Sequence, residues 1–153
     1  MKIAIGCDPN AYKLKKIIIR NLISSGHIVK DFGSEDPVYA NTAVNVAKSA
    51  VNGEFERGIV ICGTGVGVSI AANKVPGAYC ALATNAYQAE RAALSNNANL
   101  IALGSQVTGE KLALLIVKTW LSNKYIPGGR SEPKIKRICD FEKEFNNGVY
   151  GIY

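Results

Sequence analysis

Short apolar runs alternate with segments of helical periodicity along the chain, and this alternation constrains the fold more than any other feature. Residues 2–6 (KIAIG) and 57–62 (RGIVIC) are apolar runs bounded by turn residues, as expected for strands buried on both faces. Residues 11–24 instead carry apolar side chains at helical spacing. Strands that alternate with helices build a parallel sheet covered on both faces. The sequence therefore predicts a Rossmann-like three-layer α/β/α sandwich with a five-stranded parallel sheet and a C-terminal helix.

The rest of the chain follows the same alternation and divides near a glycine pair. Pro127-Gly128-Gly129 is expected to separate an α/β domain (1–126) from a C-terminal linker and helix (127–153) that packs on a partner subunit. The predicted strands are 2–6, 27–32, 57–62, 79–83 and 99–103, and the predicted helices are 11–24, 39–51, a short one ending near 74, 85–95, 108–121 and 131–146.

Composition excludes several functional classes. The chain has no apolar run near the ~20 residues that span a bilayer, and its N-terminus lacks a signal peptide's long apolar region, so we expect a cytoplasmic protein without membrane contact. Its four cysteines form no CxxC pair and have no histidine nearby, which argues against zinc and for reduced thiols. The net charge of +6 suits an acidic partner. Because no basic stretch is interleaved with aromatic residues, we expect a small phosphate or carboxylate rather than nucleic acid.

The loop after the third predicted strand, CGTGVG, is the most informative motif. Its glycines allow backbone N–H groups to converge on an anion, and a helix N-terminus follows. Cys62 stands at the edge of this loop, where a thiolate could abstract a proton next to a carbonyl while the N–H groups hold the enediolate oxygen. A nucleotide-phosphate loop, or a tight turn beside an inert buried cysteine, explains the motif equally well. No GK[ST] follows, which excludes a Walker loop, and the GxGxG spacing does not fit a dinucleotide fingerprint.

Other candidates each have a structural alternative. Asp8 follows a strand and precedes a helix, so it could cap the helix or bind substrate hydroxyls. Tyr39 could belong to the core or present its hydroxyl in a pocket. The lone His27 lies at a helix-to-strand turn and is expected to be structural. Arg130 could be a solvated charge, but with Lys134 one turn later it could also clamp an anion.

As a set, these segments resemble the ribose-5-phosphate isomerase B family, which includes the two subunits of galactose-6-phosphate isomerase. The resemblance rests on MKIAIGCD, SGHIVKDFGS, RGIVICGTGVGVSIAANKVPG, NNANLIALG and GGR, in register from Met1 to about Ile138. It implies a homodimer or homotetramer with active sites between subunits and no metal or organic cofactor. It also implies an aldose–ketose isomerase that moves a proton between C1 and C2 of a small anionic sugar through a cis-enediol.

The resemblance assigns roles residue by residue. Cys62 matches the catalytic base; some members use a Glu six residues later, where this chain has Val68. Gly63, Thr64, Gly65 and Gly67 match the loop that holds the enediolate, and Thr64 or a water is our candidate for the second acid. The residues that match binders of the sugar and its anionic end are Asp8, Tyr39, Asn96 and Arg130, with Lys134 in place of an arginine.

The chain also departs from the family pattern. It has Pro9, Ser95 and Ser131 where the family has histidines, and Thr84-Asn85 where it has His-Asp. Without an imidazole at Ser95, opening a sugar ring has no evident acid. Three hypotheses follow: an open-chain substrate, such as a tetrose phosphate or an uronate-derived ketose; one half of a hetero-oligomer whose partner supplies the histidine; or a non-catalytic sugar-phosphate-binding protein.

Overall fold

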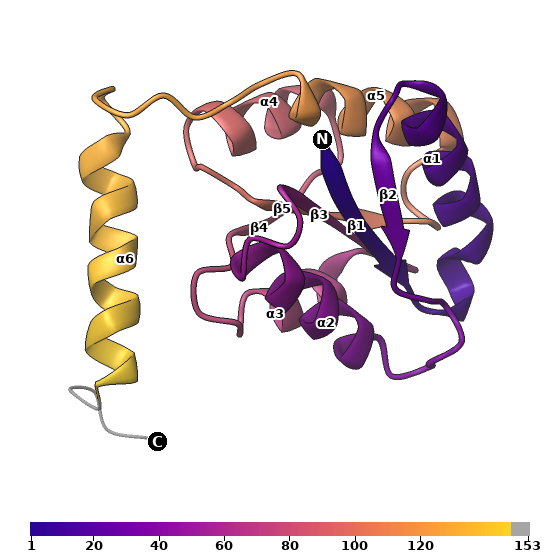
Figure 1. Ribbon diagram of the computed structural model, residues 1–153, viewed down its shortest axis with the longest axis horizontal. Coiled ribbons are helices and arrows are strands. Elements are labelled where there is room, and N and C mark those ends of the chain that lie inside the picture. Colours follow the sequence, from indigo (N-terminus) through magenta and orange to yellow (C-terminus); the bar gives the residue numbers. More distant parts are fainter. Residues whose placement is uncertain (148–153) are drawn as a thin grey trace.

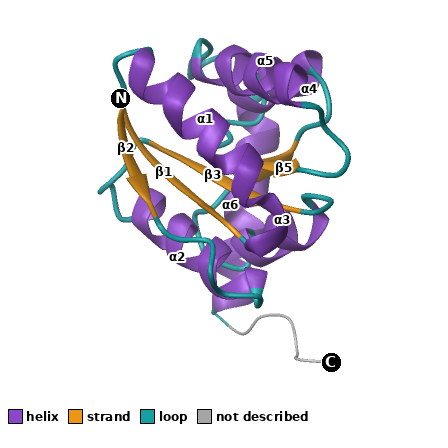
Figure 2. Ribbon diagram, turned by 90° about the vertical axis from the view of Figure 1, so that its right-hand side faces the viewer, coloured by secondary structure: helices purple, strands orange, loops and turns teal. Residues whose placement is uncertain are grey.

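The computed structural model describes residues 1–147, which form a five-stranded, all-parallel sheet between two layers of helices (Figures 1 and 2). The strand order is β2-β1-β3-β5-β4. The strands are β1 (Lys2–Cys7), β2 (Ile28–Asp31), β3 (Arg57–Cys62), β4 (Cys80–Leu82) and β5 (Leu100–Gly104). The helices are α1 (Tyr12–Ser24), α2 (Tyr39–Val51), α3 (Val66–Ala72), α4 (Ala86–Leu94), α5 (Glu110–Leu121) and α6 (Glu132–Asn146), with a 3-10 turn, η1 (Pro9–Ala11).

The predicted fold class is confirmed, and every predicted strand and helix is present. The differences lie at the ends of elements, where α5 begins at Glu110 rather than at residue 108 and β2 is shorter than expected. No helix within residues 1–147 is long and apolar enough to cross a membrane.

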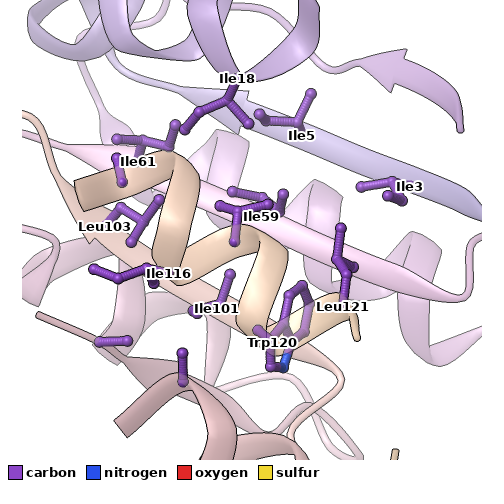
Figure 3. Packing of buried hydrophobic residues seen from close by; sticks show 14 of the residues in the cluster. Ile3, Ile5, Ile18, Ile59, Ile61, Ile101, Leu103, Ile116, Trp120 and Leu121 are labelled. Carbon is purple, nitrogen blue, oxygen red and sulfur yellow. The ribbon is translucent and has the colours of Figure 1, made fainter. Parts of the chain in front are cut away.

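The sheet is covered by one hydrophobic cluster on each face. Helices α1, α4 and α5 lie on one face, and α2 and α3 lie on the other (Figure 1). On the first face, Ile59 and Ile61 of β3 pack beneath Ile116 and Trp120 of α5, all fully buried (Figure 3). Successive residues of a strand point to opposite faces, so Val60 and Cys62 belong to the second cluster. Because both faces are buried, the strands read as continuous apolar runs.

Helix α6 lies beyond the β4 edge of the sheet (Figure 1). It contacts its own chain there: the Tyr79 hydroxyl lies 3.0 Å from Cys139 Sγ, and the Gly77 N–H donates to Glu142 Oε1 at 2.9 Å. Whether the helix also packs on a partner subunit stays a prediction. Residues 148–153 of the proposed C-terminal segment lie outside the described part of the chain.

Candidate active site

The carboxyl ends of β1, β3 and β5 meet at one level of the sheet. Cys7 is level with Ile61, and Cys62 is level with Gly104. Two backbone hydrogen bonds continue this alignment beyond the strands: the Asp8 N–H donates to the Ile61 carbonyl, and the Ser105 N–H donates to the Cys62 carbonyl. In doubly wound sheets, ligands bind at the carboxyl ends of the strands. The loops that follow β1, β3 and β5 therefore line the candidate active site.

Cys62 ends β3 with its side chain 5% exposed, and its sulfur accepts the Gly65 N–H at 3.1 Å. A hydrogen bond donated to sulfur stabilises a thiolate over a thiol. Two other cysteines are in a different situation, because burial raises the pKa of Cys7 to about 12 and that of Cys80 to about 12. These two thiols stay protonated at neutral pH. Cys139 lies on α6, where its sulfur contacts the Tyr79 hydroxyl. Cys62 is therefore the cysteine best placed to act as a base.

Gly65 shapes the loop that follows Cys62. Its φ of +80° lies in the left-handed region that favours glycine. A Cβ at this position would lie 2.6 Å from Leu82 Cδ1 and 2.8 Å from the Leu103 carbonyl carbon, both in neighbouring strands. The turn brings the Gly65 N–H back to the sulfur of Cys62 and starts α3 at the next residue. The N–H groups in the first turn of a helix have no intrahelical acceptor, so those after Val66, whose N–H donates to Thr64, are available to an oxyanion.

Thr64 and Tyr39 border the same loop. Thr64 is exposed, and its Oγ1 accepts the Val66 N–H at 3.3 Å. Tyr39 begins α2, and its ring lies against Gly67 so closely that a Cβ on the glycine would be 2.5 Å from Tyr39 Cζ and 2.8 Å from its hydroxyl oxygen. Gly67 thus makes room for the tyrosine ring at the start of α3. The ring is 42% exposed rather than part of the core.

Asp8 is buried, and its carboxylate does not cap the following 3-10 turn. One oxygen, Oδ2, accepts from Asn10 Nδ2 at 3.4 Å. The other, Oδ1, is buried and has no hydrogen-bond partner among residues 1–147. A buried carboxylate oxygen without a donor is costly. A substrate hydroxyl would supply the missing donor, so the observed geometry favours the binding alternative over the helix cap.

Asn96 and Arg130 lie near the amino ends of the strands, opposite the carboxyl ends that carry Cys62. Asn96 precedes β5, whereas Cys62 is level with the last residue of β5. The strand between them is roughly 13 Å long at about 3.3 Å per residue, so Asn96 is separated from Cys62 by about the length of β5. Arg130 lines a cavity of about 270 Å³ together with Ser95, beside Asn96. Lys134 is exposed in the first turn of α6 and does not line that cavity. The candidate residues of one chain thus form two groups at opposite ends of the strands.

Two residues at the Cys62 edge were missed from the sequence. The Gln106 N–H donates to the Gly63 carbonyl, and the Gln106 side-chain amide lies about 3.4 Å from where a Cβ of Gly63 would stand. Ser105 donates from its hydroxyl to the Asn10 carbonyl at 3.2 Å and so joins the first loop to the last. Both directly follow β5. Applying the carboxyl-end rule to the fifth strand, as to the others, would have found them.

Within residues 1–147, no group of three or more histidine, cysteine or acidic side chains is arranged to hold a metal ion.

Comparison with known proteins shows a consistent set of relatives. Residues 3–138 match the family described as Ribose/Galactose Isomerase. The chain is 43% identical to ribose-5-P isomerase B of Listeria innocua, over 94% of this chain and 99% of that one. It is 40% identical to D-erythrulose-4-phosphate isomerase of Pectobacterium atrosepticum, over 94% and 97% respectively. Among solved structures, ribose-5-phosphate isomerase B of Clostridium thermocellum superposes with a TM-score of 0.90 at 45% identity, covering 95% of this chain and 99% of that one.

Proposed function

Because the chain belongs to the Ribose/Galactose Isomerase family, we propose that it interconverts the aldose and ketose forms of a small sugar phosphate, with a four-carbon sugar as the preferred substrate. The matches cover nearly the whole length of these relatives, which are named as sugar-phosphate isomerases. This supports the reaction class. The observation that carries the assignment to this site is the Gly65 N–H donated to Cys62 Sγ, because it holds the sulfur beside a loop able to bind an oxyanion.

The proposed mechanism moves one proton and no other atom between carbons. The Cys62 thiolate takes the proton from the carbon next to the carbonyl. The electron pair of that C–H bond forms the C1–C2 double bond, and the carbonyl π pair moves to oxygen, giving a cis-enediolate. N–H groups of the Gly63–Gly67 loop stabilise that oxygen. The Cys62 thiol then returns the proton to the other carbon, while Thr64 or a water moves the proton between the two oxygens.

Two side chains orient the substrate at the same edge. Asp8 Oδ1 accepts a hydroxyl of the sugar, which provides the partner that this buried atom lacks. The Tyr39 hydroxyl, which lies against Gly67 close to the first turn of α3, donates a hydrogen bond to the sugar.

A complete site needs two copies of the chain. Asn96 and Arg130 lie about one strand length from Cys62. In a symmetric dimer, the amino ends of the strands of one copy can face the carboxyl ends of the other. Each site then combines two half-sites, one from each copy. Arg130 of one copy binds the phosphate of a sugar whose C1 and C2 lie at Cys62 of the other. Lys134, one turn later on α6, contributes positive charge at longer range.

Pairing two impaired variants tests the shared site. We expect a mixed oligomer of Cys62→Ala and Arg130→Ala chains, purified through two different tags, to recover about half of the wild-type activity at low substrate concentration, because one site of each symmetric pair is intact. A mixture of Cys62→Ala with Asp8→Ala is the matched control. Those residues belong to the same half-site, so each site of that pair stays defective. Equal recovery in both mixtures, or none in the first, would contradict the shared site.

The preference for a four-carbon substrate rests on the missing imidazole. The chain contains one histidine, His27, and its Nδ1 lies 3.4 Å from the amino group of Met1. His27 lines a different cavity from Ser95 and Arg130. Neither copy in a homo-oligomer therefore supplies an imidazole at the Ser95 position to open a sugar ring. A tetrose phosphorylated on O4 has no hydroxyl that closes a five-membered ring, so it needs no ring-opening acid. The Pectobacterium relative is named for such a substrate.

Proton exchange in D₂O at the carbon next to the carbonyl, which is C2 of an aldose and C1 of a ketose, is followed by NMR with the purified chain alone and tests the substrate. The panel contains D-erythrulose 4-phosphate, ribose 5-phosphate, galactose 6-phosphate and an open-chain uronate-derived ketose. We expect exchange with the tetrulose phosphate at a kcat/KM at least tenfold above that for either ring-forming phosphate. A higher kcat/KM for a ring-forming sugar or for the uronate-derived ketose would overturn the four-carbon assignment. The absence of exchange with every compound would overturn the homo-oligomeric enzyme and favour a hetero-oligomer with a histidine-bearing sister chain.

A further inference from the structure

The cavity that holds Arg130 contains a second arginine that neither the sequence motifs nor the proposed mechanism uses. The end of α4 contributes Arg91, Leu94 and Ser95 to the lining of this cavity of about 270 Å³. The segment between α5 and α6 contributes the other wall, with Tyr125, Ile126, Gly129, Arg130 and Ser131. Figure 1 shows this segment passing α4 on its way to α6. Two arginines therefore line one small cavity.

Arg91 has unused hydrogen-bonding capacity at this place. Its Nε is buried and has no hydrogen-bond partner among residues 1–147. Its Nη2 donates to Glu90 Oε1 at 2.9 Å, and the guanidinium lies 5.9 Å from the centre of the Tyr87 ring. An arginine presents five N–H donors in a planar fork. Glu90 occupies one side of the fork, and the Nε side is left without an acceptor.

The backbone fixes Arg91 relative to the residues assigned to substrate binding. The Arg91 carbonyl accepts both the Ser95 N–H at 2.8 Å and the Asn96 N–H at 3.2 Å. These bonds end α4 and determine the turn that carries Asn96. Across the cavity, no carboxylate within residues 1–147 forms an ion pair with Arg130. The cavity thus combines an unpaired guanidinium with a partly paired one, beside a substrate-binding asparagine.

We propose that Arg91 binds the anionic end of the substrate together with Arg130, through the guanidinium donors that Glu90 does not occupy. The inference builds on the proposed function and adds a binding residue to that site. Lys134 stands where the resemblance implies an arginine, and a lysine offers a point charge without a fork. Arg91 supplies a fork from a different element, α4, inside the cavity that Lys134 does not line. A phosphate, with three terminal oxygens, can accept from both arginines at once.

Glu90 has a distinct part in this arrangement. Its carboxylate already accepts from Arg91 Nη2 and competes with any second anion for the fork. Removing that charge should leave Arg91 more available and make the cavity more positive. Glu90→Gln is therefore expected to lower the KM for an anionic substrate, opposite to the effect of changing Arg91 itself.

The test measures KM and kcat for Arg91→Gln with the best substrate of the panel, using the full-length chain. We expect KM to rise about ten- to hundredfold, the range for charge-assisted hydrogen bonds to an anion, with kcat changed less than about threefold. Arg91→Lys, which keeps the charge, should recover part of the affinity. Arg20→Gln is the matched control, because Arg20 is an exposed arginine of α1 that does not line the cavity. Its KM should equal that of the wild type.

Inorganic phosphate gives a readout that does not depend on turnover. Phosphate should raise the Tm of the wild type and of Arg20→Gln, and its Kd from calorimetry should be at least tenfold weaker for Arg91→Gln. This measurement separates the inference from the proposed function, because phosphate binding is observable even if no sugar of the panel reacts. An unchanged KM and an unchanged phosphate Kd in a folded Arg91→Gln or Arg91→Lys variant would overturn the proposal. So would a fall in kcat with no change in KM or phosphate affinity, since that pattern marks a purely structural role.

Discussion

Replacing Cys62 with alanine is expected to lower kcat by about 10²–10⁴-fold, the usual contribution of a positioned general base. The alanine removes the sulfur that accepts the Gly65 N–H and would take the substrate proton. It keeps most of the volume at a buried position, so the fold should persist. The measurement is kcat, together with proton exchange in D₂O at C1 of the ketose or C2 of the aldose, which reports the proton-transfer step directly.

Cys80→Ala is the matched control for that experiment. Cys80 is also a buried thiol on the same face of the sheet, but burial raises its pKa to about 12 and it lies on β4, away from the Cys62 loop. Its substitution removes a thiol of the same size without removing the proposed base. We expect kcat within about twofold of the wild type and a small loss of stability. Full activity in Cys62→Ala, or an equal loss in Cys80→Ala, would refute the role of Cys62.

Gly65→Ala is expected to destabilise the protein by about 2–5 kcal/mol, the sum of about 1–2 for a left-handed alanine and about 1–3 for overpacking. The new methyl would lie 2.6 Å from Leu82 Cδ1 and 2.8 Å from the Leu103 carbonyl carbon, so the loop must move away from β4 and β5. That movement also withdraws the Gly65 N–H from Cys62. Unfolding in urea should show the lost stability, and kcat should fall even under conditions in which the variant is fully folded.

Gly53→Ala separates the backbone cost from the packing cost. Gly53 has a φ of +77°, similar to that of Gly65, but nothing lies within 4 Å of the position its Cβ would take. We expect a loss of about 1–2 kcal/mol from the left-handed conformation alone, with kcat unchanged because Gly53 is remote from the site. If both variants lost the same stability, contact with β4 and β5 would not be what requires glycine at position 65.

Much of the candidate site was predictable because it is local in sequence. Cys62, Gly63, Thr64, Gly65 and Gly67 form one continuous loop, so their proximity follows from the chain itself. Asp8 was predictable for a different reason: the end of β1 must lie at the same edge of a parallel sheet as the end of β3. Whether Asp8 caps the helix or binds a ligand could not be predicted, because it depends on whether a donor faces each carboxylate oxygen.

Contacts that join separate elements were not predictable in this way. The amide of Gln106 against Gly63 and the ring of Tyr39 against Gly67 depend on how β5 and α2 pack beside the loop. Arg91 lines a cavity only because the segment after α5 packs beside the end of α4. Such contacts arise from side-chain packing between elements, which hydrophobic periodicity does not encode.

Local periodicity was enough to predict the alternation of strands and helices and the parallel sheet. The few backbone shapes that glycine-rich turns adopt were enough to predict the loop that carries Cys62. The packed structure was needed to show that Arg130 lies beside Ser95 and that Arg91 shares their cavity, because this depends on how the segment after α5 packs against α4. The separation of Asn96 from Cys62 follows instead from the direction of the chain. In a parallel sheet, the residue that ends a strand and the residue that precedes the next strand lie at opposite ends of the strands. Neighbours in a motif can therefore belong to different half-sites.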